Sequence, residues 1–180
     1  HPTTEVDHPG APTCVHTPPT DLARRLSLLG VALQVACPGA PMVFAGDEMG
    51  MWGGNDPDCR RPLPWPELGQ QANPDLTHGS LEYTDQYRHW LKLRSHPDLG
   101  DALRWGDFRV LLADDPDVVM IERQLNRTRV RIAVNRGERT IEARALSVTG
   151  FERLQLPNAQ PDEDPKLLKA VSAAVWFRHG

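Results

Sequence analysis

A helical apolar pattern followed at once by a short apolar run is the feature that most restricts how this chain can fold. Leucine, valine and alanine recur at helical spacing from Asp21 to Ala36, and Thr20 stands in position to cap the helix that they predict. The sequence CPGAP then ends the helix through its prolines and glycine. Residues 41–46, PMVFAG, form a continuous apolar run that is typical of a strand buried on both faces. Helix, short loop and buried strand together predict an α/β unit.

A polar loop, GDEMGMWGGNDPDCRRPLPW, begins where this predicted strand ends and spans residues 46–65. It holds a cluster of acids and arginines among its glycines, and it closes on Trp65. In parallel α/β folds, ligands bind at the carboxyl ends of the strands. The position of residues 46–65 therefore predicts a functional loop on physical grounds alone.

The second half of the chain has the pattern of an all-β domain. Residues 81–95 predict an amphipathic helix, and after Gly100 short β-rich runs alternate with turn sequences. Val130, Ile132 and Val134 show the period of two that is expected of a half-buried strand. The β-rich runs are FRVLLAD, DVVMIERQL, RTRVRIAVNRG, RTIEARAL, FERLQLP and AVSAAVWFR, with NAQPDEDPKLLK as a charged surface loop between the last two. Several strands at this close spacing predict a small antiparallel sandwich.

Composition argues against several classes of protein. The 180 residues carry a formal net charge of −4, which argues against a nucleic-acid partner because such proteins present a basic face. No apolar run approaches the roughly 20 residues of a membrane-spanning helix, so no membrane partner is expected. The three cysteines, Cys14, Cys37 and Cys59, are widely spaced without a CxxC pair. This pattern argues against zinc and favours a reducing, cytoplasmic compartment.

The stretch CPGAPMVFAGDEMGMWGGNDPDCRRPLPW, residues 37–65, resembles the end of the catalytic barrel in the α-amylase family of glycoside hydrolases. The resemblance points to the neopullulanase, cyclomaltodextrinase and maltogenic amylase group. The family pattern combines a PG-x-P turn, an apolar strand, G-D-E-x-G, then G-G-N-D-P-x-x-R-x-P and a tryptophan. The chain carries these elements as Pro38-Gly39, Pro41, Gly46-Asp47-Glu48, Gly50, Gly53-Gly54-Asn55-Asp56-Pro57, Arg60, Pro62 and Trp65. Residues 96–124 also look like the family's passage into its C-terminal sandwich, so the resemblance extends from Asp21 to Arg178.

This resemblance implies a fold of α/β plus all-β class. Residues 1–20 are then an irregular lead-in loop, and residues 21–97 are the last helix, strand and helix of a (β/α)8 TIM barrel. Residues 98–180 are the C-terminal antiparallel β-sandwich. One strand and two helices cannot close a barrel of about 250 residues. Residues 21–97 are therefore expected to need the N-terminal portion of the same barrel, or another chain such as a second copy, as a partner.

Retaining cleavage of a glycosidic bond needs a carboxylate nucleophile and a carboxylic acid about 5–5.5 Å apart. In the α-amylase family these groups, with a third carboxylate, follow the fourth, fifth and seventh strands. The chain offers no counterpart for them, since Asp7-His8 has the reverse order of the family's His-Asp pair. Asp47 and Glu48 are adjacent at a strand end, so they are expected to point to opposite faces and to brace the barrel rim. The resemblance thus implies no catalytic residue here and an inactive isolated chain.

Within the motif N-D-P-x-x-R, the resemblance assigns sugar contacts to Asp56 and Arg60, on the non-reducing side of the cleavage point. A carboxylate accepts hydrogen bonds from vicinal hydroxyls, and a guanidinium donates to them in a fixed fork. The alternative is a structural Asp–Arg pair that braces the loop. Asn55 is included as a substrate contact. Trp52 has two alternatives, stacking on a sugar face or filling the underside of the loop. No metal and no cofactor is expected.

Residues and resemblance together predict part of a retaining α-glucan glycoside hydrolase or transglycosidase. Its substrates are expected to be maltodextrin-, cyclodextrin- or pullulan-like, so its small-molecule partner is an α-glucan oligosaccharide. A non-catalytic carbohydrate-binding or structural module is the alternative interpretation of the same residues.

Overall fold

The computed structural model describes residues 18–54, 56, 58–60, 62–63, 81–112, 115–155, 164 and 166–180. The chain divides into two compact units. Unit 1 consists of His1–Ser27 with Met42–Tyr87, and unit 2 consists of Leu28–Pro41 with Arg88–Gly180. The division crosses both long helices. The boundary predicted near residue 98 stays a prediction.

Helix α1 spans Asp21–Ala36, as the apolar spacing predicts. Thr20 caps its start, because the backbone N–H of Ala23 donates to Thr20 Oγ1 at 3.2 Å. The cap satisfies an amide that has no partner within the helix. The buried side chains of α1 all lie in its C-terminal half, within unit 2: Leu29, Val31, Ala32, Val35 and Ala36.

Two further helices complete the α-helical part of the described chain. Helix α2 spans Leu81–Leu93 and so ends slightly before the predicted end of the helix. Helix α3 spans Gly100–Trp105 and is not predicted by the sequence pattern. Six residues give less than two helical turns, which is too short for an apolar period to appear.

The prediction of a strand at residues 41–46 is wrong for this structure. Residues 41–44 have no regular secondary structure, and Ala45 and Gly46 begin a turn. Met42 is 76% exposed and Phe44 is 44% exposed. A strand forms only by pairing with another strand, and the described residues of unit 1 contain none.

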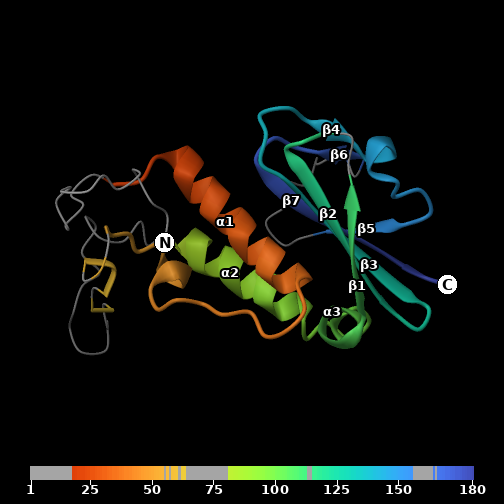
Figure 1. Ribbon diagram of the computed structural model, residues 1–180, viewed down its shortest axis with the longest axis horizontal. Helices are drawn as coiled ribbons and strands as arrows, with labels where there is room; N and C mark the ends of the chain where they lie inside the picture. Colours follow the sequence, from red (N-terminus) through yellow and green to blue (C-terminus); the bar gives the residue numbers. More distant parts are fainter. Residues whose placement is uncertain are drawn as a thin grey trace. The chain divides into compact units, whose positions relative to one another are not determined.

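A five-stranded sheet in unit 2 has the order β1–β2–β3–β7–β5 (Figure 1). Its strands are β1 (Asp107–Leu112), β2 (Val118–Leu125), β3 (Thr128–Asn135), β5 (Glu152–Leu154) and β7 (Ser172–His179). Every neighbouring pair is antiparallel, which confirms the antiparallel all-β domain predicted for this half.

A smaller second sheet pairs β4 (Ile141–Glu142) with β6 (Leu167–Leu168). Two details differ from the prediction. The run RTIEARAL is only briefly a strand and continues as a 3-10 turn, η4 (Ala143–Leu146), while the predicted charged surface loop contains β6. The turn forms because Ala143 and Leu146, three residues apart, both point into the core, which a 3-10 turn allows.

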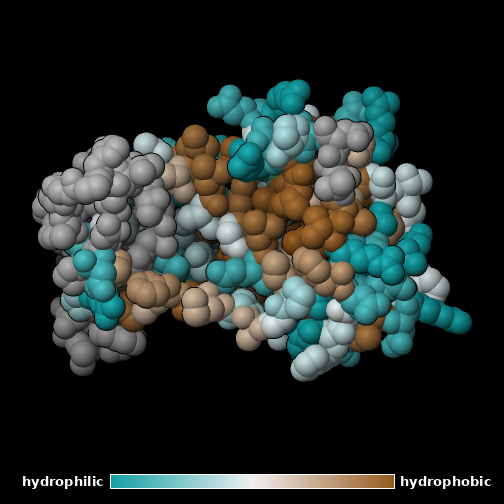
Figure 2. All heavy atoms as spheres, in the orientation of Figure 1, coloured by the Kyte–Doolittle hydropathy of each residue, from teal (hydrophilic) through white to brown (hydrophobic). Residues whose placement is uncertain are grey.

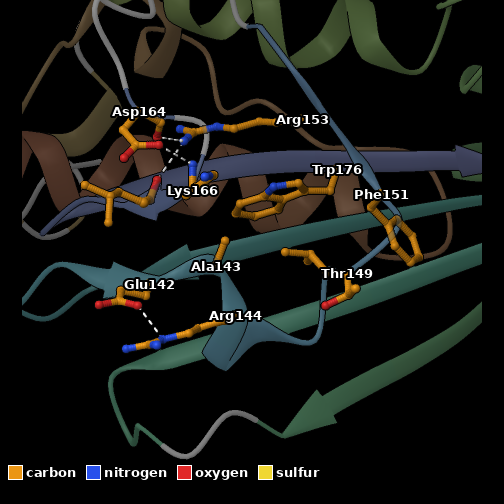
Figure 3. Close-up of a pocket in the computed structure, with 11 residues that line it drawn as sticks. Glu142, Ala143, Arg144, Thr149, Phe151, Arg153, Asp164, Lys166 and Trp176 are labelled. Carbon is orange, nitrogen blue, oxygen red and sulfur yellow. Dashed lines mark hydrogen bonds and ion pairs between the residues drawn. The ribbon is translucent and has the colours of Figure 1, made fainter.

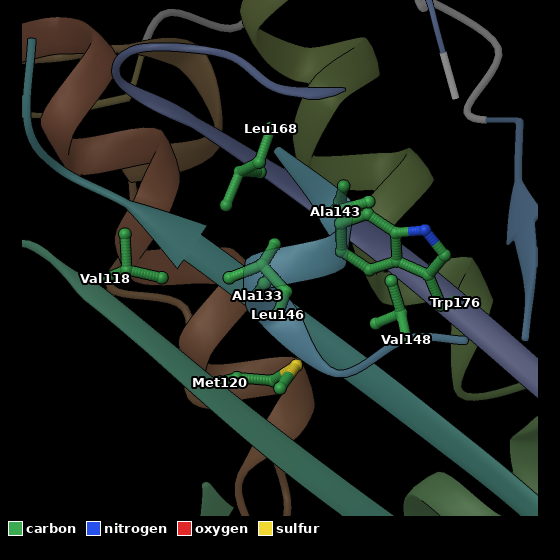
Figure 4. Close-up of a cluster of buried hydrophobic side chains, with 9 residues drawn as sticks. Val118, Met120, Ala133, Ala143, Leu146, Val148, Leu168 and Trp176 are labelled. Atoms are coloured by element: carbon green, nitrogen blue, oxygen red, sulfur yellow. The ribbon is translucent and has the colours of Figure 1, made fainter. Parts of the chain in front are cut away.

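The core of unit 2 lies between the large sheet and the layer of β4, η4 and β6 (Figure 4). Met120, Ala133 and Trp176 enter it from neighbouring strands, and Leu146 enters it from η4. Alternate residues of a strand point to the same face, so Ala133 of β3 lies in this core while its neighbours Val130 and Ile132 lie on the other face of the sheet. The result is a small sandwich of two layers.

On the opposite face of the large sheet, Val130 and Ile132 are buried, as are Leu99 and Leu103 at helix α3. Hydrophobic side chains also gather on the surface over this sheet (Figure 2). In this part of unit 2 the exposed large side chains are Trp105, Phe108 and Val110.

Two arginines, Arg94 and Arg123, bind the C-terminal end of α1 within unit 2. Arg94 donates to the carbonyls of Val35 and Cys37, each at 3.1 Å, and to that of Gly39 at 2.6 Å. Arg123 is 2% exposed and donates to the carbonyl of Ala36 at 3.1 Å. The last carbonyls of a helix lack partners within it, so these contacts satisfy them.

Candidate functional site

The predicted functional loop begins with a tight turn in unit 1. Gly46 and Gly50 have φ values of 99° and 67°, and Asp47–Met49 between them forms a 3-10 turn, η1. The backbone N–H of Met51 donates to the carbonyl of Gly46 at 3.0 Å. A Cβ atom at Gly46 would lie 2.6 Å from Met51 Sδ, so glycine is required on both steric and conformational grounds.

Glu48 braces this turn. Its Oε2 atom accepts a hydrogen bond from the backbone N–H of Gly46 at 3.0 Å. Its backbone carbonyl accepts one from Thr84 Oγ1 on α2 at 2.9 Å, which anchors the loop to the helix. These contacts agree with the bracing role predicted for Glu48. Sequence reasoning did not single out Thr84, whose only signal is its place beside the buried Tyr83 on α2.

Two tyrosines of α2 lie close to the same turn. Gly50 is in contact with the ring of Tyr83, since a Cβ there would lie 3.4 Å from its Cγ. Burial, followed by the charge of Asp47, raises the pKa of Tyr87. Burial also raises the pKa of Tyr83, although its hydrogen bond with Ser27 acts in the opposite direction. Both side chains are therefore neutral phenols at neutral pH.

The middle of the loop turns back on itself. A Cβ atom at Gly53 would lie 2.9 Å from the carbonyl oxygen of Asp58, and the backbone N–H of Gly54 donates to Asp58 Oδ2 at 2.6 Å. Asp58 begins a second 3-10 turn, η2 (Asp58–Arg60). Trp52 is only 3% exposed, in keeping with the alternative in which it fills the underside of the loop. Its contact with a sugar stays a prediction.

Asp56 and Arg60 lie together as a two-point ion pair. Arg60 Nε is 2.8 Å from Asp56 Oδ1, and Arg60 Nη2 donates to Asp56 Oδ2 at 2.8 Å. The side chains are 59% and 70% exposed, respectively, so the pair contributes at most about 1 kcal/mol to stability. The carboxylate occupies one side of the guanidinium and leaves the donors of Nη1 available. The arrangement suits both alternatives, a braced loop and a contact for a polyhydroxylated ligand.

Other predicted features of this loop lie outside the described residues, namely Asn55, Pro57 and Trp65. No group of three or more His, Cys, Asp and Glu side chains in the described part of the chain is arranged to hold a metal ion. None of the helices that the structure describes is both long and apolar enough to cross a membrane.

Comparison with known proteins gives two informative relatives. The chain is 34% identical over 122 residues to a cyclomaltodextrinase of Geobacillus thermopakistaniensis, which covers 66% of this chain and 18% of that protein. It is 39% identical over 66 residues to neopullulanase 2 of Thermoactinomyces vulgaris, which covers 37% of this chain and 10% of that protein. No family model matches the chain.

Solved structures extend this likeness to most of the chain. The ligand-free cyclic α-maltosyl-(1→6)-maltose hydrolase of Arthrobacter globiformis matches with a TM-score of 0.60 and 30% identity, over 86% of this chain and 30% of that one. The Nostoc punctiforme debranching enzyme matches with a TM-score of 0.58 and 28% identity, over 86% and 31%. The chain is thus similar to part of several glycoside hydrolases of the α-amylase family.

The chain spans less than a fifth of the length of the curated proteins reported above. The likeness to known enzymes confirms the resemblance that residues 37–65 indicate.

Proposed function

We propose that this chain is the C-terminal part of a retaining glycoside hydrolase or transglycosidase that acts on maltodextrin-, cyclodextrin- or pullulan-like α-glucans. The observation that carries the proposal is the exposed Asp56–Arg60 pair, held on a glycine-closed loop. The names of the relatives, cyclomaltodextrinase and neopullulanase, support the same class of substrate.

In this proposal the chain binds the sugar and another part of the protein breaks the bond. Asp56 accepts hydrogen bonds from vicinal glucose hydroxyls, and the Nη1 donors of Arg60 bind the hydroxyl oxygens. The ion pair fixes both groups before the ligand arrives, which lowers the entropy cost of binding. The two carboxylates of a retaining mechanism come from residues outside this chain.

Replacing Asp56 with alanine in the intact enzyme is expected to lower kcat/KM on maltodextrin by about 10–100-fold. Hydrogen bonds to a charged group contribute about 1.5–3 kcal/mol each, and 1.4 kcal/mol corresponds to tenfold. Steady-state kinetics on maltodextrin, cyclodextrin and pullulan measure the loss. Asp101→Ala is the matched control, because Asp101 also forms an exposed ion pair, with Arg104 at 2.6 Å, in unit 2. Unchanged kcat/KM on all three substrates would remove Asp56 from the sugar groove.

The exposed apolar side chains of unit 1 support the second part of the proposal, that residues 21–97 complete a barrel with other residues. Four large side chains are involved, Leu22 at 48%, Leu26 at 39%, Met42 at 76% and Phe44 at 44% exposed. Exposed apolar groups in one compact unit indicate a missing cover. We infer that the cover is the N-terminal portion of the same barrel, with self-association as the substitute when that portion is absent.

The 180-residue chain alone is expected to self-associate or to bind a hydrophobic dye, and a polypeptide that includes the N-terminal portion is not. Light scattering and dye fluorescence measure the two properties. Changing Met42 and Phe44 to serine in the isolated chain should reduce both signals. Changing Trp105 to serine, in unit 2, should leave the signals of unit 1 in place. A stable monomer that melts cooperatively without dye binding would contradict the inference.

A further inference from the structure

The loop of unit 1 carries two aspartates, Asp56 and Asp58, that lie in different surroundings. The Asp56 side chain is 59% exposed and is paired with Arg60. Asp58 is half-buried, and its Oδ2 atom accepts a hydrogen bond from the backbone N–H of Gly54 at 2.6 Å. The proposed function uses Asp56 and leaves Asp58 without a role.

The bond between Gly54 and Asp58 joins two parts of the chain on either side of Asp56. Gly54 lies two residues before Asp56, and Asp58 lies two residues after it. A hydrogen bond to an ionised carboxylate is about twice as strong as one between neutral groups. The bond therefore restricts the movement of the segment that carries Asp56.

Gly53 fits closely against the same aspartate. A Cβ atom at Gly53 would lie 2.9 Å from the carbonyl oxygen of Asp58 and 3.3 Å from its Oδ2 atom. Because Cβ atoms do not approach a carbonyl oxygen this closely, a side chain at residue 53 would displace one of the two backbones. The two adjacent glycines thus serve one contact, in which Gly53 leaves space for Asp58 and Gly54 donates to it.

Asp58 also begins the turn that places Arg60. The turn η2 spans Asp58–Arg60, so the backbone that Asp58 fixes continues directly into Arg60. Arg60 contacts Asp56 at two points, through Nε and Nη2, each at 2.8 Å. A two-point contact requires a defined geometry of both partners, since a small shift breaks one of its bonds. The Gly54–Asp58 bond therefore supports both members of the pair.

We propose that Asp58 is a positioning residue of the sugar site, which acts through the Asp56–Arg60 pair and does not contact the sugar. The inference rests on the proposed function, in which this pair binds glucose hydroxyls. Asp58 binds backbone within the loop, whereas the side chains of Asp56 and Arg60 are exposed. Without the bond to Gly54, the pair is no longer fixed before the ligand arrives, and the entropy cost of binding rises.

Replacing Asp58 with alanine in the intact enzyme is expected to lower kcat/KM on maltodextrin about tenfold. A displacement of about 1 Å at a positioned group can cost up to about 100-fold in rate. The loss should appear mainly in KM, because the pair binds sugar away from the bond that breaks. Asp58→Asn keeps an oxygen that accepts from Gly54, so it should retain at least about half of the wild-type kcat/KM.

A variant that lacks the pair tests whether Asp58 acts through it. In an Asp56→Ala, Arg60→Ala background, changing Asp58 to alanine should alter kcat/KM by less than about twofold, since residues that act as a unit are not additive. A further loss of about tenfold in that background would overturn the positioning role, because it would indicate a direct contact between Asp58 and the sugar.

Asp164→Ala is the matched control, because Asp164 makes the same kind of bond in unit 2. Its Oδ1 atom accepts from the backbone N–H of Lys166 at 2.8 Å, in the turn before β6 (Figure 3). This variant should leave KM and kcat within about twofold of wild type.

Thermal unfolding and kinetics together separate positioning from stability. A purely structural role would reduce the fraction of folded enzyme, which lowers the apparent kcat and leaves KM unchanged, and that result for Asp58→Ala would overturn the inference. Gly53→Ala disturbs the same contact with the carboxylate in place, and it should raise KM as Asp58→Ala does. Wild-type KM in Gly53→Ala would count against the contact.

The variants also separate this inference from the proposed function. If Asp56→Ala lowers kcat/KM and Asp58→Ala leaves it unchanged, the inference is overturned and the proposed function stands. If Asp56→Ala leaves kcat/KM unchanged on all substrates, the proposed sugar contact is overturned, and the positioning role of Asp58 with it.

Discussion

Replacing Trp176 with alanine is expected to lower the free energy of unfolding of the sandwich by about 3–5 kcal/mol. The side chain is 2% exposed and lies in the core cluster between the large sheet and η4. Its removal deletes apolar contacts and leaves a cavity that Met120 and Leu146 cannot fill from fixed positions on β2 and η4. Urea unfolding of this chain, followed by far-UV circular dichroism, should show a transition shifted to lower urea.

Trp105→Ala is the matched control for this substitution. Trp105 is 74% exposed, so the same truncation should change the free energy of unfolding by no more than about 0.5 kcal/mol. Trp176→Phe keeps much of the apolar volume and should cost less than half as much as alanine. A Trp176→Ala variant that unfolds at the wild-type urea concentration would show that this cluster is not the core of the sandwich.

Helix α1 was predictable because all its signals are local. The apolar spacing, the cap at Thr20 and the stop at Pro38-Gly39 lie within the helix or next to it, and the helix spans Asp21–Ala36 as predicted. Strand β3 was predictable for the same reason, since its period of two is visible within eight residues. The elements that the sequence predicts correctly are therefore those with a local pattern long enough to show its period.

The predictions that failed concern elements that depend on contacts between residues distant in the sequence. Residues 41–46 have the composition of a buried strand, but forming one depends on neighbouring strands that the described residues of unit 1 do not contain. Strand β6 is two residues long and forms because β4 pairs with it from a distance in sequence. Neither fact has a local signal, because pairing depends on the whole fold.

The candidate site shows the same division. The motif placed Asp56 and Arg60 in one loop, and the structure joins them directly. The sequence allows both a buried and a sugar-facing Trp52, since a tryptophan beside glycines has no local pattern that distinguishes a buried side chain from an exposed one.

Replacing Arg123 with methionine is expected to lower the free energy of unfolding of unit 2 by about 3–5 kcal/mol. Arg123 donates to the carbonyl of Ala36 at 3.1 Å and to that of Gly106 at 2.9 Å, and hydrogen bonds to a charged group contribute about 1.5–3 kcal/mol each. Methionine keeps an apolar chain in the site but leaves both carbonyls without this donor. Urea unfolding measures the loss, and hydrogen exchange of residues 28–36 should become faster as the end of α1 loosens.

The charge of Arg123 explains why the loss should exceed that of an ordinary hydrogen bond. Burial, with the neighbouring charge of Arg94, lowers the pKa of Arg123, yet an arginine stays protonated in proteins. No carboxylate among the described residues forms an ion pair with it, so the negative end of the α1 dipole is its counter-charge. Arg123→Lys should therefore recover part of the stability, since it keeps the charge but loses the fork that reaches both carbonyls. Arg109→Met, at an exposed position of β1, should stay within about 0.5 kcal/mol of wild type. Equal effects at Arg109 and Arg123 would contradict a capping role, because Arg123 donates to the carbonyl of Ala36 at the end of α1 and Arg109 lies on β1 at an exposed position.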